Sequence, residues 1–169
     1  GAEAVPGRME PVDEGQGFGV LVDYAHTPDS LENVLRAARR LTAGRLICVY
    51  GCGGDRDAGK RPLMGGAGAE LSDVAVVTSD NPRSEEPAAI AAEVAAGAAA
   101  AGVEPLVLVD RRAAIHRALA EAAPNDVVVI AGKGHETYQV TAGVQEPFDD
   151  RVVAREALEA LERAGKGEP

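Results

Sequence analysis

Short runs of consecutive apolar residues recur along the chain, and between them apolar residues return every three or four positions. The runs are rich in β-branched residues, which is typical of strands buried on both faces of a parallel sheet. They are GVLVD (19–23), LICVY (46–50), VAVVTS (74–79), LVLVD (106–110) and VVVIAG (127–132). A weaker run, YQV (138–140), predicts an edge strand near 137–140.

The stretches between these runs predict helices. In PDSLENVLRAARRL (28–41) the apolar residues follow one helical face, with Thr27 suited to the N-cap and Pro28 to the first turn. The segment 86–101 is nearly all alanine, but alanine is the best helix former, so we predict a packed helix there. The other predicted helices cover about 61–71, 111–122 and 149–164.

The alternation of strands and helices predicts an α/β fold, a three-layer Rossmann-like open sheet that is mostly parallel, with helices on both faces. Ligands of such sheets bind at the C-terminal ends of the strands. Four polar clusters follow predicted strands there: DYAHTP (23–28), GCGGDRDAGKR (51–61), SDNPR (79–83) and AGKGHE (131–136). Their shared position indicates a binding site.

Composition narrows the class of partner. The 169 residues suit one domain, and a net charge of −10 argues against nucleic acid or an anionic membrane as partner. No apolar run approaches the ~18–20 residues that span a bilayer, and no signal peptide is visible. The C-x-x-x-C spacing of Cys48 and Cys52 fits neither a redox nor a paired zinc motif, so we expect a cytoplasmic protein without a metal site. The start GAEAVPGRME lacks an initiator Met, and we expect a piece of a longer chain.

The glycine-rich cluster imitates a phosphate-binding loop, because Gly54 to Lys60 spells G-x-x-x-x-G-K. A working loop of that kind ends in Ser or Thr, whose hydroxyl binds magnesium, whereas this chain has Arg61. Asp55 and Asp57 would also repel a triphosphate. Two interpretations stay open: a turn with surface ion pairs, or a loop that binds a zwitterion.

The other clusters leave similar choices. Pro82 stiffens the turn before Arg83, so the guanidinium is either a rigid clamp for a carboxylate or simply solvated. In AGKGHE, a backbone carbonyl and Glu136 can receive an ammonium group, although a histidine next to a glutamate also suits a structural hydrogen-bonded pair. Asp23 suits a hydroxyl or a metal-bound nucleotide, with a plain helix-entry turn as the alternative. His116, on a predicted helix, is expected to be structural. Arginines and carboxylates in one pocket suggest an amino acid as ligand, without identifying the reaction.

Taken in order, these clusters resemble the C-terminal domain of the Mur ligases, and within that family the enzymes that add the third residue of the peptidoglycan stem peptide. The stretches that carry the resemblance span nearly the whole chain. They are VPGRME (5–10), DYAHTPDSLENVL (23–35), CVYGCGGDRDAGKRPLMG (48–65), VVTSDNPRSEEP (76–87), DRRAAI (110–115) and AGKGHETYQ (131–139).

The resemblance implies an amino-acid substrate and its binding residues. In this family DNPR marks the form that uses meso-diaminopimelate rather than lysine. Arg83 would attract the second carboxylate of diaminopimelate and repel a bare lysine ammonium, and Glu136 with the Gly132 carbonyl would take the distal ammonium. The implied substrate-binding residues are Arg56, Asp80, Asn81, Pro82, Arg83, Gly132 and Glu136. The implied ATP-contacting residues are Arg8, Asp23 and His26.

The resemblance also implies a division of labour with domains that this sequence lacks. Residues 1–16 would be a linker or the end of a central domain, 17–165 the amino-acid-binding domain, and 166–169 a tail. The missing N-terminal and central domains would bind the UDP-sugar, ATP and Mg²⁺, so we expect no catalytic or metal-binding residue in this chain. The full enzyme would phosphorylate a carboxylate of UDP-MurNAc-L-Ala-D-Glu, and the amine of diaminopimelate would attack the acyl phosphate.

Two alternatives remain at this level. One is the C-terminal domain of another ATP-dependent amide ligase, of the folate polyglutamate or cyanophycin type. The other is a stand-alone amino-acid-binding module. As a domain of the resembled ligase, the chain by itself is not expected to catalyse ligation.

Overall fold

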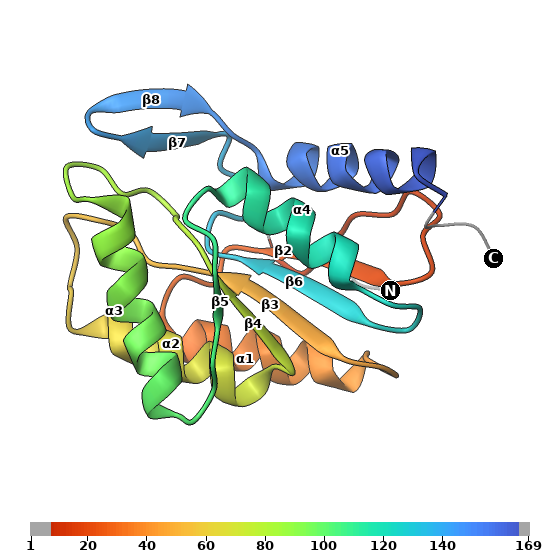
Figure 1. Cartoon of the computed structure of the whole chain (residues 1–169), viewed down its shortest axis with the longest axis horizontal. Helices are drawn as coiled ribbons and strands as arrows, with labels where there is room; N and C mark the ends of the chain where they lie inside the picture. The colour runs from red at the N-terminus through yellow and green to blue at the C-terminus, as the bar shows by residue number, and fades with distance from the viewer. Residues whose placement is uncertain (1–7, 166–169) are drawn as a thin grey trace.

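In the computed structural model, which describes residues 8–165, six strands form one sheet with helices on both faces (Figure 1). The strands lie in the order β1-β2-β6-β3-β4-β5; all neighbours pair in parallel except β1, which is antiparallel to β2. The predicted α/β fold is therefore confirmed. The strands are β1 (Glu10–Pro11), β2 (Gly19–Asp23), β3 (Leu46–Tyr50), β4 (Val74–Val77), β5 (Leu106–Val107) and β6 (Val127–Ala131).

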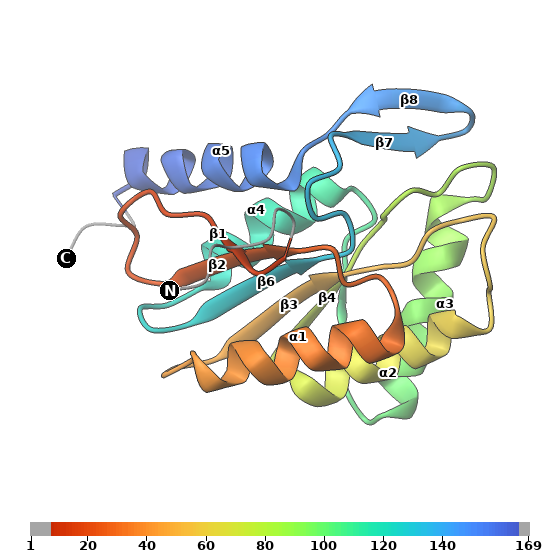
Figure 2. The same cartoon turned by 180° about the vertical axis from the view of Figure 1, so that it is seen from behind.

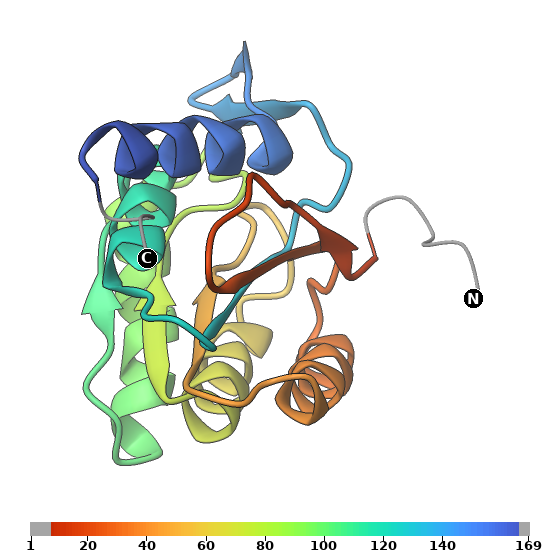
Figure 3. The same ribbon diagram turned by 90° about the vertical axis from the view of Figure 1, so that its right-hand side faces the viewer.

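Within residues 8–165, five helices cover the sheet in two layers, as predicted. They are α1 (Pro28–Arg40), α2 (Lys60–Leu71), α3 (Pro87–Ala100), α4 (Arg111–Glu121) and α5 (Asp150–Arg163). Figure 3 shows α1 and α2 on one side of the sheet and α4 and α5 on the other. Central strand β3 serves both cores: Cys48 and Tyr50 pack with α1–α3, whereas Ile47 and Val49 pack with α4 and α5.

The start of α1 follows from its local sequence. Thr27 and Ser30 form a capping box, in which the Thr27 hydroxyl accepts from the Ser30 N–H (3.2 Å) and the Ser30 hydroxyl accepts from the Thr27 N–H (3.1 Å). Pro28 occupies the first turn, where its missing N–H costs nothing. The helix then buries its apolar stripe of Leu31, Val34, Leu35 and Ala38. Its first turn is thereby fixed beside the end of β2.

The alanine-rich α3 is a packed helix because it crosses α2 at very short range. A Cβ added to Gly65 of α2 would lie 1.8 Å from the Val94 carbonyl oxygen, and one added to Gly97 of α3 would lie 2.0 Å from that of Pro62. The Tyr50 hydroxyl donates to the Gly65 carbonyl (2.8 Å) from beneath the crossing. Small side chains in this segment thus serve close backbone contact.

The strand predicted at 138–140 forms, but it does not lie at the edge of the main sheet. It is β7 (Tyr138–Thr141), and it pairs with β8 (Val144–Pro147) in a separate hairpin that projects beyond the sheet (Figure 2). An isolated parallel β-bridge between Arg83 and Thr141 joins it to the turn after β4. Strands β1 and β8 had no counterpart in the sequence analysis.

The described part of the chain holds no helix that is long and apolar enough to cross a membrane. Residues 1–7 of the predicted linker and the predicted tail 166–169 lie outside the described residues.

Candidate functional site

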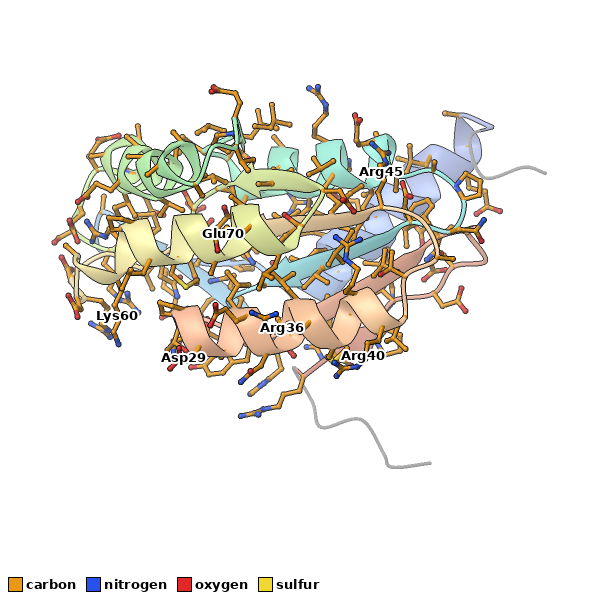
Figure 4. The ribbon with its side chains drawn as sticks, turned by 90° about the horizontal axis from the view of Figure 1, so that it is seen from below. Asp29, Arg36, Arg40, Arg45, Lys60 and Glu70 are labelled. Atoms are coloured by element: carbon orange, nitrogen blue, oxygen red, sulfur yellow. The ribbon has the colours of Figure 1, made fainter. Side chains whose placement is uncertain are left out.

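Two adjoining cavities lie at the C-terminal ends of the strands. The larger, of about 520 Å³, is lined by residues from all four predicted polar clusters. The smaller, of about 410 Å³, lies between the N-terminal segment, the end of β2 and α1. Tyr24, His26 and Thr27 line both cavities. Figure 4 gives the orientation: Lys60, at the cavity end of the sheet, lies far from Arg45, which precedes β3 at the opposite end.

The larger cavity brings together most of the residues that the resemblance had singled out. Its lining includes Arg56, Asp80, Asn81, Arg83, Gly132 and Glu136. Pro82 is buried and does not line the cavity; its carbonyl instead accepts from the Glu85 N–H (3.1 Å) and closes the turn.

The turn after β4 is tied to the glycine-rich loop. Arg83 has a left-handed backbone (φ +53°), and its Nη1 donates to the Gly54 carbonyl (2.8 Å). The Gly54 N–H in turn donates to the Asn81 carbonyl (2.8 Å). The guanidinium is therefore held on one side by the protein itself, which is the rigidity that a carboxylate clamp needs.

The β7–β8 hairpin supports the same turn from another direction. Gln139 donates from Nε2 to the Asp80 carbonyl (2.7 Å), and the Val140 N–H donates to the Asn81 side-chain oxygen (2.9 Å). The Arg83 N–H donates to the Val140 carbonyl (2.9 Å). These contacts show why YQV is extended although it lies outside the main sheet.

The glycine-rich loop is anchored by Arg61, the residue that replaces the hydroxyl of a phosphate loop. Its side chain is buried, with Nη2 2.6 Å from Glu85 and Nη1 2.8 Å from Glu93 of α3. Hydrogen bonds from Arg61 lower the pKa of the Glu85 carboxyl. Arg56, in contrast, is exposed, lines the cavity and donates to the Asp55 carbonyl (2.9 Å). Each interpretation of the loop is therefore represented by one arginine. Arg61 makes ion pairs that hold the turn, whereas Arg56 lines the cavity, where a zwitterion could bind.

The two aspartates of the loop serve its turns. Asp55 has φ +56°, and its carboxylate accepts from the Ser84 hydroxyl (2.5 Å) and N–H (3.2 Å), which lowers its pKa. Asp57 accepts from the Gly59 N–H (3.0 Å) just before α2. Neither carboxylate is arranged to hold a phosphate.

Below the cavity lies a buried ammonium that the sequence analysis did not assign. Lys133, next to Gly132, is fully buried, with Nζ 3.0 Å from Asn81 Oδ1, 3.5 Å from Asp80 Oδ1 and 3.6 Å from Glu136 Oε1. Burial lowers its pKa, while the nearby Asp80 and Glu136 carboxylates act in the opposite direction. Lysine is rarely fully buried, so the sequence around Lys133 gave no reason to expect a buried ammonium at this position.

A second buried ion pair fastens the strands that carry the site. Arg111 of α4 binds Asp150 of α5 through Nη2 (2.7 Å) and Nε (2.8 Å), with both side chains fully buried. Its Nη1 also donates to the Ser79 carbonyl (2.9 Å) and its Nη2 to the Ala131 carbonyl (3.1 Å). Arg111 thus joins the chain after β4 to the end of β6, and the sequence analysis missed it.

The smaller cavity contains Arg8, Asp23 and His26, the residues that the resemblance placed near ATP. Both Asp23 oxygens are in use, because they accept from the Met9 N–H (2.7 Å) and the Ala25 N–H (2.8 Å). His26 is exposed; its Nδ1 lies 2.9 Å from the Tyr24 carbonyl. Asp23 therefore organises the helix-entry turn, while Arg8 and His26 offer polar groups to the cavity.

In residues 8–165, no group of three or more His, Cys, Asp or Glu side chains is placed to hold a metal ion. Burial raises the pKa of the Cys52 thiol to about 12, so it carries almost no thiolate near neutral pH. His116 lies 3.0 Å from Glu156 between α4 and α5, as a surface contact.

Comparison with known proteins finds the same domain elsewhere. Residues 7–134 match the family model described as "Mur ligase, glutamate ligase domain". A relative from Synechocystis, a UDP-N-acetylmuramoyl-L-alanyl-D-glutamate–2,6-diaminopimelate ligase, is 59% identical over 156 residues, covering 91% of this chain and 31% of that protein. The chain thus spans about a third of the length of this relative.

Solved structures agree with this result. A ligase of the same name superposes with a TM-score of 0.87 at 44% identity, over 95% of this chain and 33% of that one. A bifunctional folylpolyglutamate synthase/dihydrofolate synthase has a TM-score of 0.56 at 21% identity, over 94% of this chain and 32% of that one. The second likeness concerns the fold alone.

Proposed function

Because the chain belongs to the Mur ligase family, through its glutamate ligase domain, we propose that it is the amino-acid-binding domain of an ATP-dependent ligase. The ligase joins meso-diaminopimelate to UDP-MurNAc-L-Ala-D-Glu during peptidoglycan synthesis in the bacterial cytoplasm. The observation that carries the proposal is the 520 Å³ cavity, whose lining includes the cations Arg56, Lys60 and Arg83 together with the carboxylates Asp57, Asp80 and Glu136. Its charges suit a ligand that carries both signs. The names of the Synechocystis relative and of the solved ligase support this particular substrate.

The cavity can recognise the distal end of diaminopimelate. Arg83 binds the second carboxylate, and Glu136 and the Gly132 carbonyl accept from the distal ammonium, with Asp80 and Asn81 beside them. Lysine ends in ammonium alone, so its charge would approach Arg83 without a carboxylate between them. Mispairing of that kind costs about 2–5 kcal/mol. Specificity then comes from repulsion as well as from attraction.

The smaller cavity belongs to the nucleotide side of the reaction. We assign Arg8 and His26 to contacts with ATP, and Asp23 to the same cavity through the turn that it holds. Under this proposal Mg²⁺ is bound mainly by the central domain of the ligase. This domain positions the amine for attack on the acyl phosphate, and we expect no ligation by the chain alone.

The test is Arg83→Asn in the full-length protein that contains this chain. Asparagine tolerates the left-handed backbone of Arg83, so the substitution removes the guanidinium without forcing the turn. We expect kcat/KM for diaminopimelate to fall by roughly 30-fold or more, because the carboxylate loses its charged partner. KM for ATP should change by less than about twofold, since the smaller cavity is untouched. Phosphate release in the presence of diaminopimelate or lysine measures both.

Arg117→Gln is the matched control, because Arg117 is exposed on α4 and lines neither cavity. Unchanged kinetics with diaminopimelate in Arg83→Asn would refute the assignment. A preference of the unmodified protein for glutamate would favour a ligase of the folate polyglutamate type instead.

A further inference from the structure

The ammonium of Lys133 is the centre of a buried polar cluster directly beneath the larger cavity. It is fully buried, and it lies within 3.0–3.6 Å of oxygens of Asn81, Asp80 and Glu136. All three of these partners line the cavity, whereas Lys133 does not. Lys133 therefore contacts the cavity wall from behind.

In each of the two carboxylates, one oxygen lies near Lys133 and the other does not. Asp80 uses Oδ1 and Glu136 uses Oε1 toward the ammonium. Among residues 8–165, no donor reaches Asp80 Oδ2 or Glu136 Oε2. Asp80 Oδ2 lies beside Gly132, 2.8 Å from where a Cβ at that position would stand. One oxygen of each carboxylate thus remains for a ligand.

Within the cluster, the one ammonium of Lys133 contacts two carboxylates, Asp80 and Glu136. Arg111 is nearby, but its guanidinium is already occupied by Asp150 and by the Ser79 and Ala131 carbonyls. Among the described residues, Lys133 is then the single cation in contact with the two carboxylates of the pair, whose sum with it is −1. A ligand ammonium at the remaining oxygens would give the two carboxylates a second cation in contact.

We propose that Lys133 is a positioning residue, which holds the carboxylates of Asp80 and Glu136 where they accept the ammonium of the amino-acid substrate, without itself touching the substrate. This inference rests on the proposed function. Without the charge of Lys133, two carboxylates would share one site, and one of them would take up a proton at higher pH. The affinity for the substrate ammonium would then fall as pH decreases, earlier than in the unmodified protein.

The experiment compares Lys133→Met, Lys133→Gln and Lys133→Arg in the full-length protein. In the two neutral variants we expect KM for diaminopimelate to rise about tenfold or more, while kcat and KM for ATP change by less than about threefold. The acid limb of kcat/KM for diaminopimelate should shift to higher pH. Lys133→Arg should keep the acid limb of the unmodified protein, because it keeps the charge.

The groups that face Lys133 and could contribute to this limb are Asp80 and Glu136, together with Arg111 of α4 and Asp150 of α5. Arg117→Met is the control for the loss of one positive charge, since Arg117 is exposed and outside both cavities. It should leave both KM values and the acid limb unchanged.

A purely structural role would lower the amount of folded enzyme, and so kcat, without moving KM or the acid limb. Unchanged KM and acid limb in Lys133→Met and Lys133→Gln would overturn the proposal. So would loss of the cooperative thermal transition in both, because Lys133 would then serve stability. If the unmodified protein does not ligate diaminopimelate, the proposed function fails, and the comparison is made with the amino acid that it does accept.

Discussion

At the scale of single residues, Gly132 combines two constraints. Its backbone has φ +121°, which side chains other than hydrogen rarely allow, and it lies against Asp80 Oδ2. Gly143, in the hairpin turn, has φ +77°, but a Cβ at that position would meet no atom within 4 Å. Comparing substitutions at the two glycines therefore distinguishes the effect of backbone strain from the effect of contact with Asp80.

We expect Gly132→Ala to be more damaging than Gly143→Ala. The hairpin variant should lose about 1 kcal/mol of unfolding free energy through backbone strain. Gly132→Ala should lose at least about 1 kcal/mol more, and should raise KM for the amino acid, because its methyl group displaces Asp80. Urea unfolding and steady-state kinetics measure the two effects. Equal losses of stability with unchanged KM would contradict this account.

The sequence predicted where the site lies better than what each residue does there. Arg83 and Glu136 could be placed in one cavity because both follow parallel strands, whose C-terminal ends meet at one edge. The roles of Arg61 and Lys133 could not be predicted, since burial of a charge depends on partners far away in the chain. For Arg61 these partners are Glu85 and Glu93.

At the scale of elements, the α2–α3 crossing depends on which glycine faces the neighbouring helix. Gly65 lies against the Val94 carbonyl, whereas a Cβ at the adjacent Gly66 would stand 3.7 Å from the nearest atom, an ordinary contact distance. Both glycines are within α2 and both are poor helix formers. They differ in packing alone.

We therefore expect opposite effects from the same substitution. Gly66→Ala should raise the free energy of unfolding by about 0.5–1 kcal/mol through helix propensity. Gly65→Ala should lower it by about 1–3 kcal/mol, since the methyl group would force the two helices apart. Thermal or urea unfolding of the pair decides the matter. A stabilising Gly65→Ala would show that the helices do not meet as closely as described.

Elements with a strong pattern of apolar residues could be predicted from the sequence, and elements without such a pattern could not. The apolar run VVVIA is buried along its whole length as β6, and the periodic stretch 28–41 became α1. Strand β8 reads VQEP and is exposed throughout, so it has no buried face to produce a pattern. YQV was recognised as extended but assigned to the wrong sheet, because its partners are β8 and the turn after β4.

At the scale of the whole molecule, the chain carries an excess of negative charge, and many of its carboxylates accept hydrogen bonds within the fold. Asp126 illustrates this, because it accepts from the Arg45 N–H (2.7 Å), the Ala123 N–H (2.8 Å) and the Arg45 guanidinium (3.1 Å). Burial alone would raise the pKa of its carboxyl, but these hydrogen bonds outweigh it and lower the pKa. The pKa of Asp73 is also lowered, because hydrogen bonds from Arg39 and from the Leu46 N–H outweigh the effect of burial. The pKa of Glu85 is lowered mainly by its hydrogen bonds from Arg61.

These shifts predict loss of stability in acid. Because the folded-state pKa values lie below the ordinary 3.8 of aspartate and 4.5 of glutamate, the unfolded chain binds more protons as pH falls. The stabilisation is therefore complete above about pH 5 and is lost as pH falls through the lowered values. Thermal unfolding from pH 7 to pH 2 should show a falling midpoint below about pH 4.

Asp126→Asn tests the contribution of one of these carboxylates. This variant should be less stable than the unmodified protein at pH 7 and should show a smaller decrease of the midpoint in acid. Glu104→Gln is the control, because Glu104 is exposed and has no ion pair in the described part of the chain, and it should follow the unmodified protein. An acid response of Asp126→Asn equal to that of the unmodified protein would show that Asp126 does not contribute to the pH dependence.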